Sequence, residues 1–458
     1  MPGPQPHTST DLPPDSPQPH LFRFWSSLSQ DEKRALVAQV ESINLNEIGT
    51  LWQSSVADSD TALAEKAAAP STLIPATIRT DDAQRFAQAE AAGWQALAEG
   101  RVGTILVAGG EGTRLGFPHP KGQFPIGPVS KKSLFQWLAE QLLAVSQRAG
   151  APIPYYIMTS DATHEETVAF FREHQYFGLN ADHVRFFRQG NMPAVDQKSG
   201  HLLLGEKHRV AVSPDGHGGL LAAFDRAGLF DDVLQRGVEY LFYHQVDNPL
   251  ARVCDPAFIG FHRLHNAEVS TKIVAKEDPA EKVGLLVEVD GRQRIIEYID
   301  VPPHIAQQTD ESGKLRLRCG NIAVHLFNAR FLQRVARENG GLPFHRSSKP
   351  VPYVDEAGEL AQPTTSNAFK FEKFIFDILP AAERALAMEI VRDDEFVPLK
   401  NREGQFSPDH VRSAMRQLHT RWLRNAGWTT EQELPVEIPP AAALCEADFL
   451  NLRVPRVG

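Results

Sequence analysis

The stretch Leu106-Val-Ala-Gly-Gly-Glu-Gly-Thr-Arg-Leu-Gly116 decides the fold, because an apolar run passes there directly into a glycine-rich turn. The apolar residues 102–108 predict a buried strand of a parallel sheet. The turn after this strand contains Gly109, Gly110 and Gly112. Without Cβ atoms, the backbone amides of such a turn can approach a phosphate or a base closely.

Two cations follow the glycine turn. Arg114 lies within the quoted stretch, and Lys121 lies in the Pro-Lys-Gly that ends at Gly122. Positive side chains just beyond a glycine turn are placed where a polyphosphate would need them, and they favour a nucleotide triphosphate as ligand. The alternative is a glycine-rich connection between strand and helix whose charges are incidental surface charges.

The spacing of these residues excludes two commoner glycine motifs. A dinucleotide-binding fingerprint counted from Gly110 and Gly112 would place a third glycine where the chain has Leu115. A Walker A loop needs lysine after its last glycine, whereas Lys121 precedes Gly122 here. Neither a nicotinamide-dependent oxidoreductase nor a P-loop enzyme is therefore indicated.

Composition narrows the class of protein. The chain has 458 residues, of which 42% are hydrophobic, so it can form a large core and two or three domains. Its formal net charge of -10 argues against nucleic acid as a partner. The three cysteines lack zinc-binding spacing and suggest reduced thiols. We find no signal peptide and no apolar run that would span a bilayer, so we expect a cytoplasmic protein without a membrane partner.

The order of predicted elements indicates an α/β protein with a mostly parallel sheet flanked by helices. We expect a disordered segment at 1–20, a helical region at 21–100, a catalytic domain at 101–385 and a small C-terminal domain at 386–458. Ser130 is predicted to cap a helix over 131–147, and 163–166 to form a capping box. Strands are predicted at 153–158, 184–187, 238–243, 270–275, 284–289 and 295–299.

Ordered motifs along the chain carry a more specific resemblance. They include KKSLFQ (131–136), FFRQGNMPA (186–194), SPDGHGGL (213–220), VDNPL (246–250), CGNIAVH (319–325), NAFKFEKFIFD (367–377) and EFVPLKN (395–401). Together with the glycine turn, they resemble the UDP-N-acetylhexosamine pyrophosphorylases within the wider UDP-sugar pyrophosphorylase group. The resemblance implies a nucleotide-diphospho-sugar transferase fold. It also implies that UTP and a sugar 1-phosphate react to give pyrophosphate and a UDP-sugar.

The resemblance assigns roles to residues around the nucleotide. Gly109, Gly110 and Gly112 would wrap the nucleotide, and Gln189 would recognise the uracil edge, which suits an amide that offers both a donor and an acceptor. Alternatively, Gln189 is an ordinary loop residue. The three catalytic cations implied are Arg114, which would hold the pyrophosphate, Lys121, which would bridge the phosphates, and Lys400, which would reach the phosphates from a C-terminal segment.

Asp247 is the predicted metal ligand. It follows a predicted strand, where open α/β sheets place their ligands, and a carboxylate is the kind of oxygen ligand that Mg²⁺ prefers. The resemblance gives the same role and Mg²⁺ as the cofactor. The alternative is an Asp that caps a helix.

The sugar site is also assigned by resemblance. Asn321 and Glu297 would contact sugar hydroxyls or the acetamido group, and Phe369 and Phe371 would line the pocket, although such aromatic runs are often core residues. The pair Gly216-His217 would lie near the nucleotide.

His217 departs from the family pattern, because N-acetylhexosamine enzymes typically have Asn at that position. The G-H-G sequence looks more like UDP-glucose or broad-specificity UDP-sugar enzymes. We interpret the sequence as that of an enzyme that synthesises UDP-N-acetylglucosamine. The alternatives are synthesis of UDP-glucose or of several UDP-sugars, and a catalytically silent UDP-sugar-binding protein. The sequence leaves the oligomeric state open.

Overall fold

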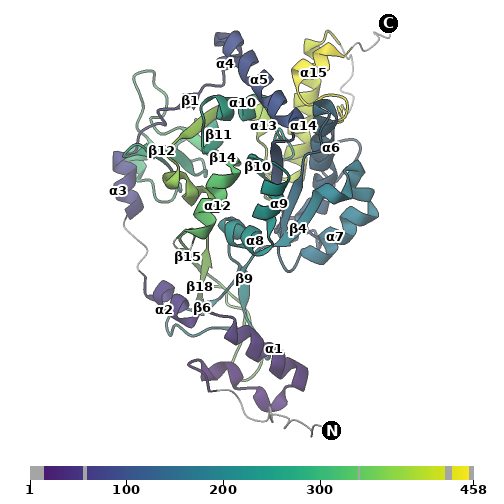
Figure 1. Cartoon of the computed structure of the whole chain (residues 1–458). Helices are drawn as coiled ribbons and strands as arrows, with labels where there is room; N and C mark the ends of the chain where they lie inside the picture. Colours follow the sequence, from purple (N-terminus) through teal and green to yellow (C-terminus); the bar gives the residue numbers. More distant parts are fainter. Residues whose placement is uncertain (1–14, 55–58, 339–340, 429–435, 453–458) are drawn as a thin grey trace. The chain divides into compact units, whose positions relative to one another are not determined.

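The structure is a computed structural model that describes residues 15–54, 59–338, 341–428 and 436–452 (Figure 1). It comprises two compact units, each built from separate stretches of the chain. The first unit takes residues 1–57, 190–219 and 342–375, and the second takes residues 58–189, 220–341 and 376–458. Most of the segment expected to be disordered, residues 1–14 of 1–20, lies outside the described residues.

The second unit is built on a sheet of ten described strands. Its main path runs in the order β1 (Leu73–Ile74), β19 (Ala385–Ile390), β11 (Val269–Ala275), β14 (Cys319–Asn328), β10 (Tyr240–Gln245), β2 (Val102–Val107), β3 (Tyr155–Thr159) and β4 (Val184–Arg188). Only β14 runs antiparallel to its neighbours on this path. A hairpin of β12 (Leu285–Val289) and β13 (Arg292–Ile296) pairs with β14. The predicted mostly parallel fold is confirmed.

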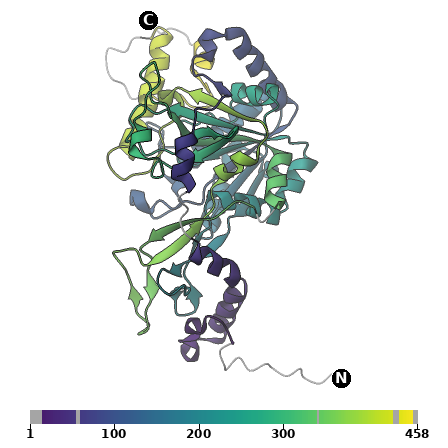
Figure 2. The same ribbon diagram turned by 90° about the vertical axis from the view of Figure 1, so that its left-hand side faces the viewer.

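Helices lie on both faces of this sheet (Figure 1, Figure 2). One face forms the main apolar core with α5 (Ala83–Ala98), α6 (Leu134–Ala149), α7 (His164–Glu173), α10 (Pro256–Leu264) and α14 (Pro408–Asn425). On the other face, Phe224 of α8 (Leu220–Arg226) packs edge-on against Tyr156 and Phe187. The remaining helices of this unit are α3 (Ser59–Lys66), α4 (Ile78–Asp81), α9 (Leu229–Gln235), α11 (Pro303–Ala306), α12 (Ala329–Arg337), α13 (Arg392–Glu395) and α15 (Glu446–Asn451).

The C-terminal residues share the core of the sheet. Val411, Met415 and Trp422 of α14 belong to the same apolar cluster as Leu106 of β2 and Phe242 of β10. The residues expected to form a small C-terminal domain therefore contribute to the second unit. The helices expected between 21 and 100 divide between the two units.

One predicted helix start and one predicted capping box are wrong. Helix α6 begins at Leu134, because Ser133 rather than Ser130 caps it by accepting a hydrogen bond from the Gln136 amide (3.1 Å). The hydroxyl of Ser130 instead accepts from the Lys132 amide (3.2 Å) and closes the preceding turn. At α7, Thr163 makes no capping hydrogen bond, since its hydroxyl accepts from the Ser160 amide.

The strand positions differ from prediction by up to three residues. Strand β10 spans Tyr240–Gln245 rather than 238–243, so that Asp247 follows the strand closely. Strand β13 spans Arg292–Ile296 rather than 295–299, because Asp290 and Gly291 form a tight turn with positive φ angles of 51° and 75°. Strands β14 and β19 were not predicted.

The first unit is small and assembled from distant segments. Its own core joins residues of α1 (Gln30–Glu41) and α2 (Leu45–Gln53) with residues from 190–219 and 342–375. Helix α1 begins with a complete capping box between Ser29 and Glu32. The strands of this unit are β5 (Asn191–Pro193), β6 (Val195–Asp196), β7 (Leu204–Glu206), β8 (Arg209–Val210), β9 (Val212–Pro214), β15 (His345–Lys349), β16 (Tyr353–Val354), β17 (Leu360–Ala361) and β18 (Ala368–Glu372).

None of the helices within the described residues has both the length and the apolar character needed to cross a membrane.

Candidate active site at the carboxyl edge of the sheet

Four parallel strands of the second unit end at one edge of the sheet. The last residue of β2, Val107, pairs with Gln245 of β10 and with Met158 of β3. At the end of β3, Thr159 pairs with Arg188 of β4. The residues that follow these strands, among them Gly109, Ser160, Gln189 and Asp247, therefore gather at the edge where open α/β sheets bind ligands.

The glycine-rich loop after β2 is closed by its own backbone. The Gly112 amide donates to the His119 carbonyl (2.9 Å), and the Lys121 amide donates to the Gly110 carbonyl (3.0 Å). Lys121 is thereby returned to the start of the loop. Arg114 lies in the part of the loop that is enclosed by these bonds, and its side chain is exposed.

Gly109 and Gln189 lie against each other. A Cβ atom at Gly109 would be only 2.4 Å from Oε1 of Gln189. Any side chain at position 109 would therefore clash with the side-chain amide of Gln189. Gln189 is 8% exposed, and its backbone amide donates to the Thr159 carbonyl (2.9 Å). The structure thus brings together two residues that were predicted to recognise the uridine.

Lys121 and Asp247 also lie close together. Nζ of Lys121 is 4.0 Å from Oδ2 of Asp247, and both side chains are largely buried, with 18% and 14% exposure. The same ammonium donates to the Leu399 carbonyl (3.5 Å), and the Leu399 amide donates to the Asp247 carbonyl (2.7 Å). One pair of opposite charges and the backbone of Leu399 are therefore brought together from three distant parts of the chain.

Lys400 follows Leu399 directly and is exposed. Its backbone amide donates to the Phe406 carbonyl (2.9 Å), which fixes the backbone and leaves the side chain in solvent. A further cation, Arg402, was not singled out from the sequence. Its guanidinium lies 3.8 Å from the Cβ position at Gly116, beside the glycine-rich loop.

The two predicted polar sugar ligands form a second group. The Asn321 amide donates to the Gly284 carbonyl (2.8 Å), and Oε1 of Glu297 lies 3.2 Å from the Cβ position of Gly284. Asn321 reaches this edge because β14 is antiparallel and therefore begins where β10 and β11 end. Its Oδ1 accepts from the Ala323 amide (3.0 Å), which orients the amide group.

Gly216 and His217 belong to the first unit. Gly216 has a φ of 83°, and the Ile375 amide donates to Nδ1 of His217 (3.1 Å). Because Nδ1 accepts, the neutral ring carries its proton on Nε2. The ring stacks on Phe374 with centroids 5.4 Å apart.

Phe369 and Phe371 also belong to the first unit, in strand β18. Phe369 is half-buried, and the guanidinium of Arg346 lies 4.3 Å from its ring centroid. Phe371 is fully buried and packs in the core of that unit. Phe369 therefore has exposed surface that a ligand can contact, whereas Phe371 has none, because its side chain is packed in the core beside β18.

The described residues contain no cluster of three or more His, Cys, Asp or Glu side chains suited to a metal ion. Cys254 and Cys319 are not suited to act as nucleophiles, because burial raises the pKa of Cys254 to about 12 and that of Cys319 to about 11. His262 is fully buried against Ser270 (2.7 Å), and His265 contacts the Phe261 carbonyl, so this histidine pair is structural.

The chain matches the family model described as UTP–glucose-1-phosphate uridylyltransferase over residues 63–431. It is 38% identical to a UDP-N-acetylhexosamine pyrophosphorylase-like protein 1 of Mus musculus, covering 94% of this chain and 89% of that protein. It is 36% identical to the UDP-N-acetylglucosamine pyrophosphorylase of Saccharomyces cerevisiae (strain ATCC 204508 / S288c), covering 92% of each.

Solved structures give the same result. A crystal structure of a UDP-N-acetylglucosamine pyrophosphorylase from Trypanosoma brucei in complex with an inhibitor has a TM-score of 0.80 at 26% identity, covering 97% of this chain and 92% of that chain. The corresponding protein of Entamoeba histolytica has a TM-score of 0.75 at 33% identity, covering 81% of this chain and 94% of that one. By sequence and by fold, this chain belongs to the UTP–glucose-1-phosphate uridylyltransferase family.

Proposed function

We propose that the protein is a uridylyltransferase that forms UDP-N-acetylglucosamine and pyrophosphate from UTP and N-acetylglucosamine 1-phosphate. The observation that carries this proposal is the arrangement at the carboxyl edge of the sheet. A glycine turn lies against the buried amide of Gln189, and the ammonium of Lys121 lies 4.0 Å from the carboxylate of Asp247. The names of the relatives that cover nine-tenths of the chain support the same reaction.

The chemistry explains why these residue types are needed. An oxygen of the sugar 1-phosphate attacks the α-phosphorus of UTP, the bond from that phosphorus to the bridging oxygen breaks, and pyrophosphate leaves. Protein groups contribute by positioning and by neutralising charge, since two anions must meet. Lys121 would bridge the phosphates, Arg114 would hold the departing pyrophosphate, and Lys400 would approach from the C-terminal segment.

Magnesium is the proposed cofactor, with Asp247 as its protein ligand. Mg²⁺ in nucleotide sites is commonly held by one or two carboxylates together with phosphate oxygens and waters. A single largely buried carboxylate near Lys121 suits a metal that arrives with the triphosphate. When bound, the metal would offset phosphate charge and fix the geometry of the triphosphate.

The uridine and the sugar would be selected by different groups. Gln189 and the Gly109–Gly110 turn would hold uracil and ribose. Asn321 and Glu297, which both adjoin Gly284, would orient the sugar. Because the three cysteines are free thiols, as is typical of a reducing compartment, we propose that the protein is cytoplasmic.

One observation favours a second candidate, the synthesis of UDP-glucose or of several UDP-sugars. The chain has His217 where N-acetylhexosamine enzymes typically have Asn, and an imidazole that is held by the Ile375 amide replaces a flexible carboxamide. This difference bears on the sugar or on its phosphate and leaves the reaction type unchanged.

The deciding experiment measures pyrophosphate release with UTP and Mg²⁺ across a panel of sugar 1-phosphates. We expect N-acetylglucosamine 1-phosphate to be the preferred substrate. A preference for glucose 1-phosphate would favour the second candidate, and His217→Asn should then move the preference back toward the N-acetylated sugar. No release with any sugar 1-phosphate would point to a silent UDP-sugar-binding protein.

A further inference from the structure

A segment near the C-terminus is bound along the turn that carries Asp247. This segment, residues 395–400, is here called the strap. Asn248 binds it twice, since its Nδ2 donates to the Glu395 carbonyl (2.7 Å) and its Oδ1 accepts from the Val397 amide (3.1 Å). The Leu399 amide adds a third bond, to the Asp247 carbonyl (2.7 Å). Every second residue of the strap is thus fixed to this turn.

The strap also sets the surroundings of the proposed phosphate-binding cations. Its Leu399 carbonyl accepts from Nζ of Lys121 (3.5 Å), and the next residue is Lys400. A shift of the strap would therefore move an acceptor of Lys121, the backbone of Lys400 and the carbonyl contact of Asp247 together.

The first residue of the strap is anchored by buried charge. Glu395 is 5% exposed, and its carboxylate binds the ammonium of Lys272, a fully buried lysine of β11. Lys272 also binds Oδ2 of Asp255 (2.7 Å). The guanidinium of Arg252 lies 3.5 Å from Asp255 and 3.8 Å from Glu395. We call these four residues the Lys272 cluster.

The two carboxylates of the Lys272 cluster respond differently to burial. Burial raises the pKa of Asp255, but Arg252 and Lys272 outweigh it and hold that pKa at about 2. Burial raises the pKa of Glu395, and the same two cations only partly offset this rise. The strap residue is therefore the more weakly compensated of the two carboxylates, and its charge depends on Lys272 remaining in place.

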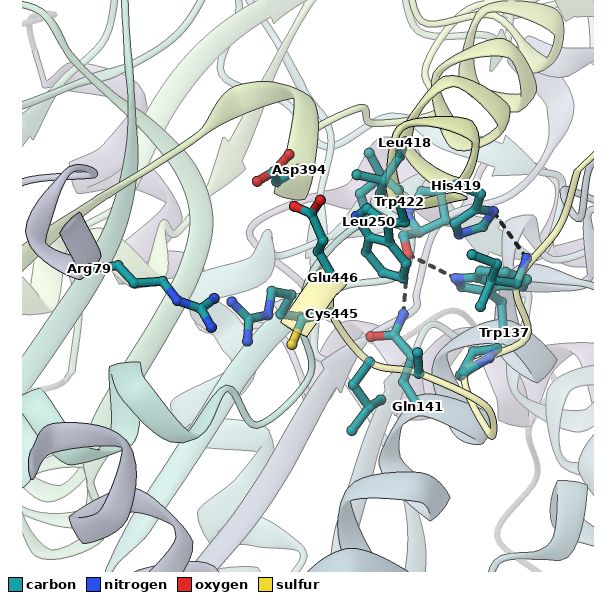
Figure 3. Close-up of a pocket in the computed structure, with 16 residues that line it drawn as sticks. Arg79, Trp137, Gln141, Leu250, Asp394, Leu418, His419, Trp422, Cys445 and Glu446 are labelled. Carbon is teal, nitrogen blue, oxygen red and sulfur yellow. Dashed lines mark hydrogen bonds between the residues drawn. The ribbon is translucent and has the colours of Figure 1, made fainter. Parts of the chain in front are cut away.

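Helix α6 also binds the turn that carries Asp247. The indole of Trp137 and the amide of Gln141 both donate to the Pro249 carbonyl, at 3.0 and 3.2 Å (Figure 3). A cavity of about 110 Å³ lies behind this point, and Asp394 and Leu250 are among the residues that line it. The turn that carries Asp247 is thus hydrogen-bonded both to α6 and to the strap.

We propose that the Lys272 cluster positions the strap for catalysis, so that Lys272, Asp255 and Glu395 are positioning residues for Lys121, Asp247 and Lys400. This inference rests on the proposed uridylyltransferase function. The cluster adds four charged groups to the unit's interior, where a well-packed apolar set could supply equal stability. The buried charges have a further effect, because they hold Glu395, the first residue of the strap. The hydrogen bonds of Glu395, Val397 and Leu399 to the turn then fix the rest of the strap in place.

The test replaces one oppositely charged pair, so that no charge is left uncompensated. In the double variant Lys272→Met/Glu395→Met, Arg252 and Asp255 still pair, and stability should be retained or increased. We expect kcat to fall on the order of 10–100-fold while the KM for each substrate changes by less than about threefold, because misplaced groups cost mainly the chemical step. Retained stability with unchanged kcat would overturn the proposal.

A matched control replaces a pair of the same kind away from the strap. Asp232 of α9 and Arg236, which directly follows that helix, form an ion pair at 2.9 Å with partly buried side chains. Their double replacement by Met should leave kcat within about twofold, because neither side chain hydrogen-bonds to the strap within the described part of the chain. If kcat fell equally in the control, both losses of activity would be attributed to a general loss of stability, and the proposal would be contradicted.

A double-mutant cycle tests whether the cluster acts through the strap. Lys400→Ala should lower kcat strongly in the wild-type background and at least fivefold less in the Lys272→Met/Glu395→Met background. Equal losses in both backgrounds would show that the cluster does not act through Lys400.

Hydrogen exchange provides a readout that does not require activity. The amides of Val397 and Leu399 should exchange at least tenfold faster in the double variant, while those of β2 and β10 stay unchanged. Unchanged exchange at Val397 and Leu399 would overturn the positioning role even in a protein that released no pyrophosphate. Failure of the positioning role is thereby distinguished from failure of the proposed function.

Discussion

The second unit holds two groups of cations in opposite environments. Arg114 and Lys400 at the carboxyl edge are exposed, and neither has an ion pair within the part of the chain that the structure describes. Lys272 and Arg252, by contrast, are buried or partly buried, and each binds two carboxylates. The residue types are the same, but their surroundings differ.

This difference indicates what each group is for. A cation enters a protein interior only with a carboxylate partner, because desolvation of an unpaired charge is costly. A cation without a partner at a strand edge keeps its hydration and its charge for an anionic ligand. The contrast therefore separates Lys272 and Arg252, which are held by buried carboxylates, from Arg114 and Lys400, which are proposed to meet the phosphates, and the following experiments challenge that separation.

The largest effect is expected for Lys272→Met alone. Two buried carboxylates would then share only Arg252, and the free energy of unfolding should fall by about 3–5 kcal/mol. Urea unfolding of both proteins measures this change. Lys400→Met serves as the exposed control and should stay within about 0.5 kcal/mol of the wild type. A loss of similar size in both variants would abolish the distinction.

Arg114→Ala should show the opposite pattern. We expect kcat to fall about 100-fold, equivalent to about 2.7 kcal/mol of transition-state stabilisation, with the unfolding free energy unchanged. Affinity for the UDP-sugar should change little, since the pyrophosphate is the proposed partner. Steady-state kinetics and calorimetric titration measure the two quantities, and equal losses in both would count against this role.

Buried imidazoles extend the comparison, because they can avoid charge by staying neutral. Burial lowers the pKa of His262 to about 3, whereas an unfolded histidine titrates near 6.5. Below pH 6.5 the unfolded chain therefore binds a proton at this histidine that the folded protein does not bind. The stabilisation from neutral His262 is fully present above pH 6.5, and the free energy of unfolding decreases as the pH falls below that value. At pH 5 this single site should cost about 2 kcal/mol.

His262→Gln tests this expectation, because glutamine keeps a hydrogen-bonding group near Ser270 and does not titrate. The unfolding free energy of the variant should depend less steeply on pH between 6.5 and 5. His304→Gln, at an exposed position of α11, is the matched control and should keep the wild-type slope. Identical slopes in all three proteins would contradict the proposed origin of the acid sensitivity.

The smallest of the four effects concerns the metal. Asp247→Asn retains the shape of the side chain but removes its charge, and the Mg²⁺ concentration at half-maximal activity should rise about tenfold. A chelator should abolish activity of the wild type, and added Mg²⁺ should restore it. An unchanged Mg²⁺ titration in the variant would remove Asp247 from the metal site.

Much of the candidate active site could be predicted from the sequence, because its residues lie directly after the ends of strands. The apolar run before Gly109, and the strand before Gln189, identify where the sheet ends, and parallel strands bring those ends together. Asp247 was placed on the same grounds, although β10 ends two residues later than predicted. Asn248 escaped notice, but it stands beside Asp247 in the same VDN motif.

Other features depend on pairing that a single sequence does not reveal. Strand β14 begins with Cys-Gly-Asn and contains Ala323 at a φ of 56°, which interrupts the alternation that marks a strand. In the first unit, Phe369 pairs with both Val195 and Ser348, which lie on separate segments of the chain. The sequence alone likewise gives no sign that Lys272 is buried, because its carboxylate partners, Asp255 and Glu395, are brought to it only by the fold.

The self-closed loop after β2 has a consequence for how fast a nucleotide can bind. Fixing a backbone residue costs about 1–2 kcal/mol in conformational entropy. Because Gly112 and Lys121 hydrogen-bond across the loop, much of this ordering is complete once the chain has folded. Less of the interaction energy is then spent on ordering when UTP arrives. Stopped-flow mixing should show one concentration-dependent phase, without a slower step that levels off as UTP is raised.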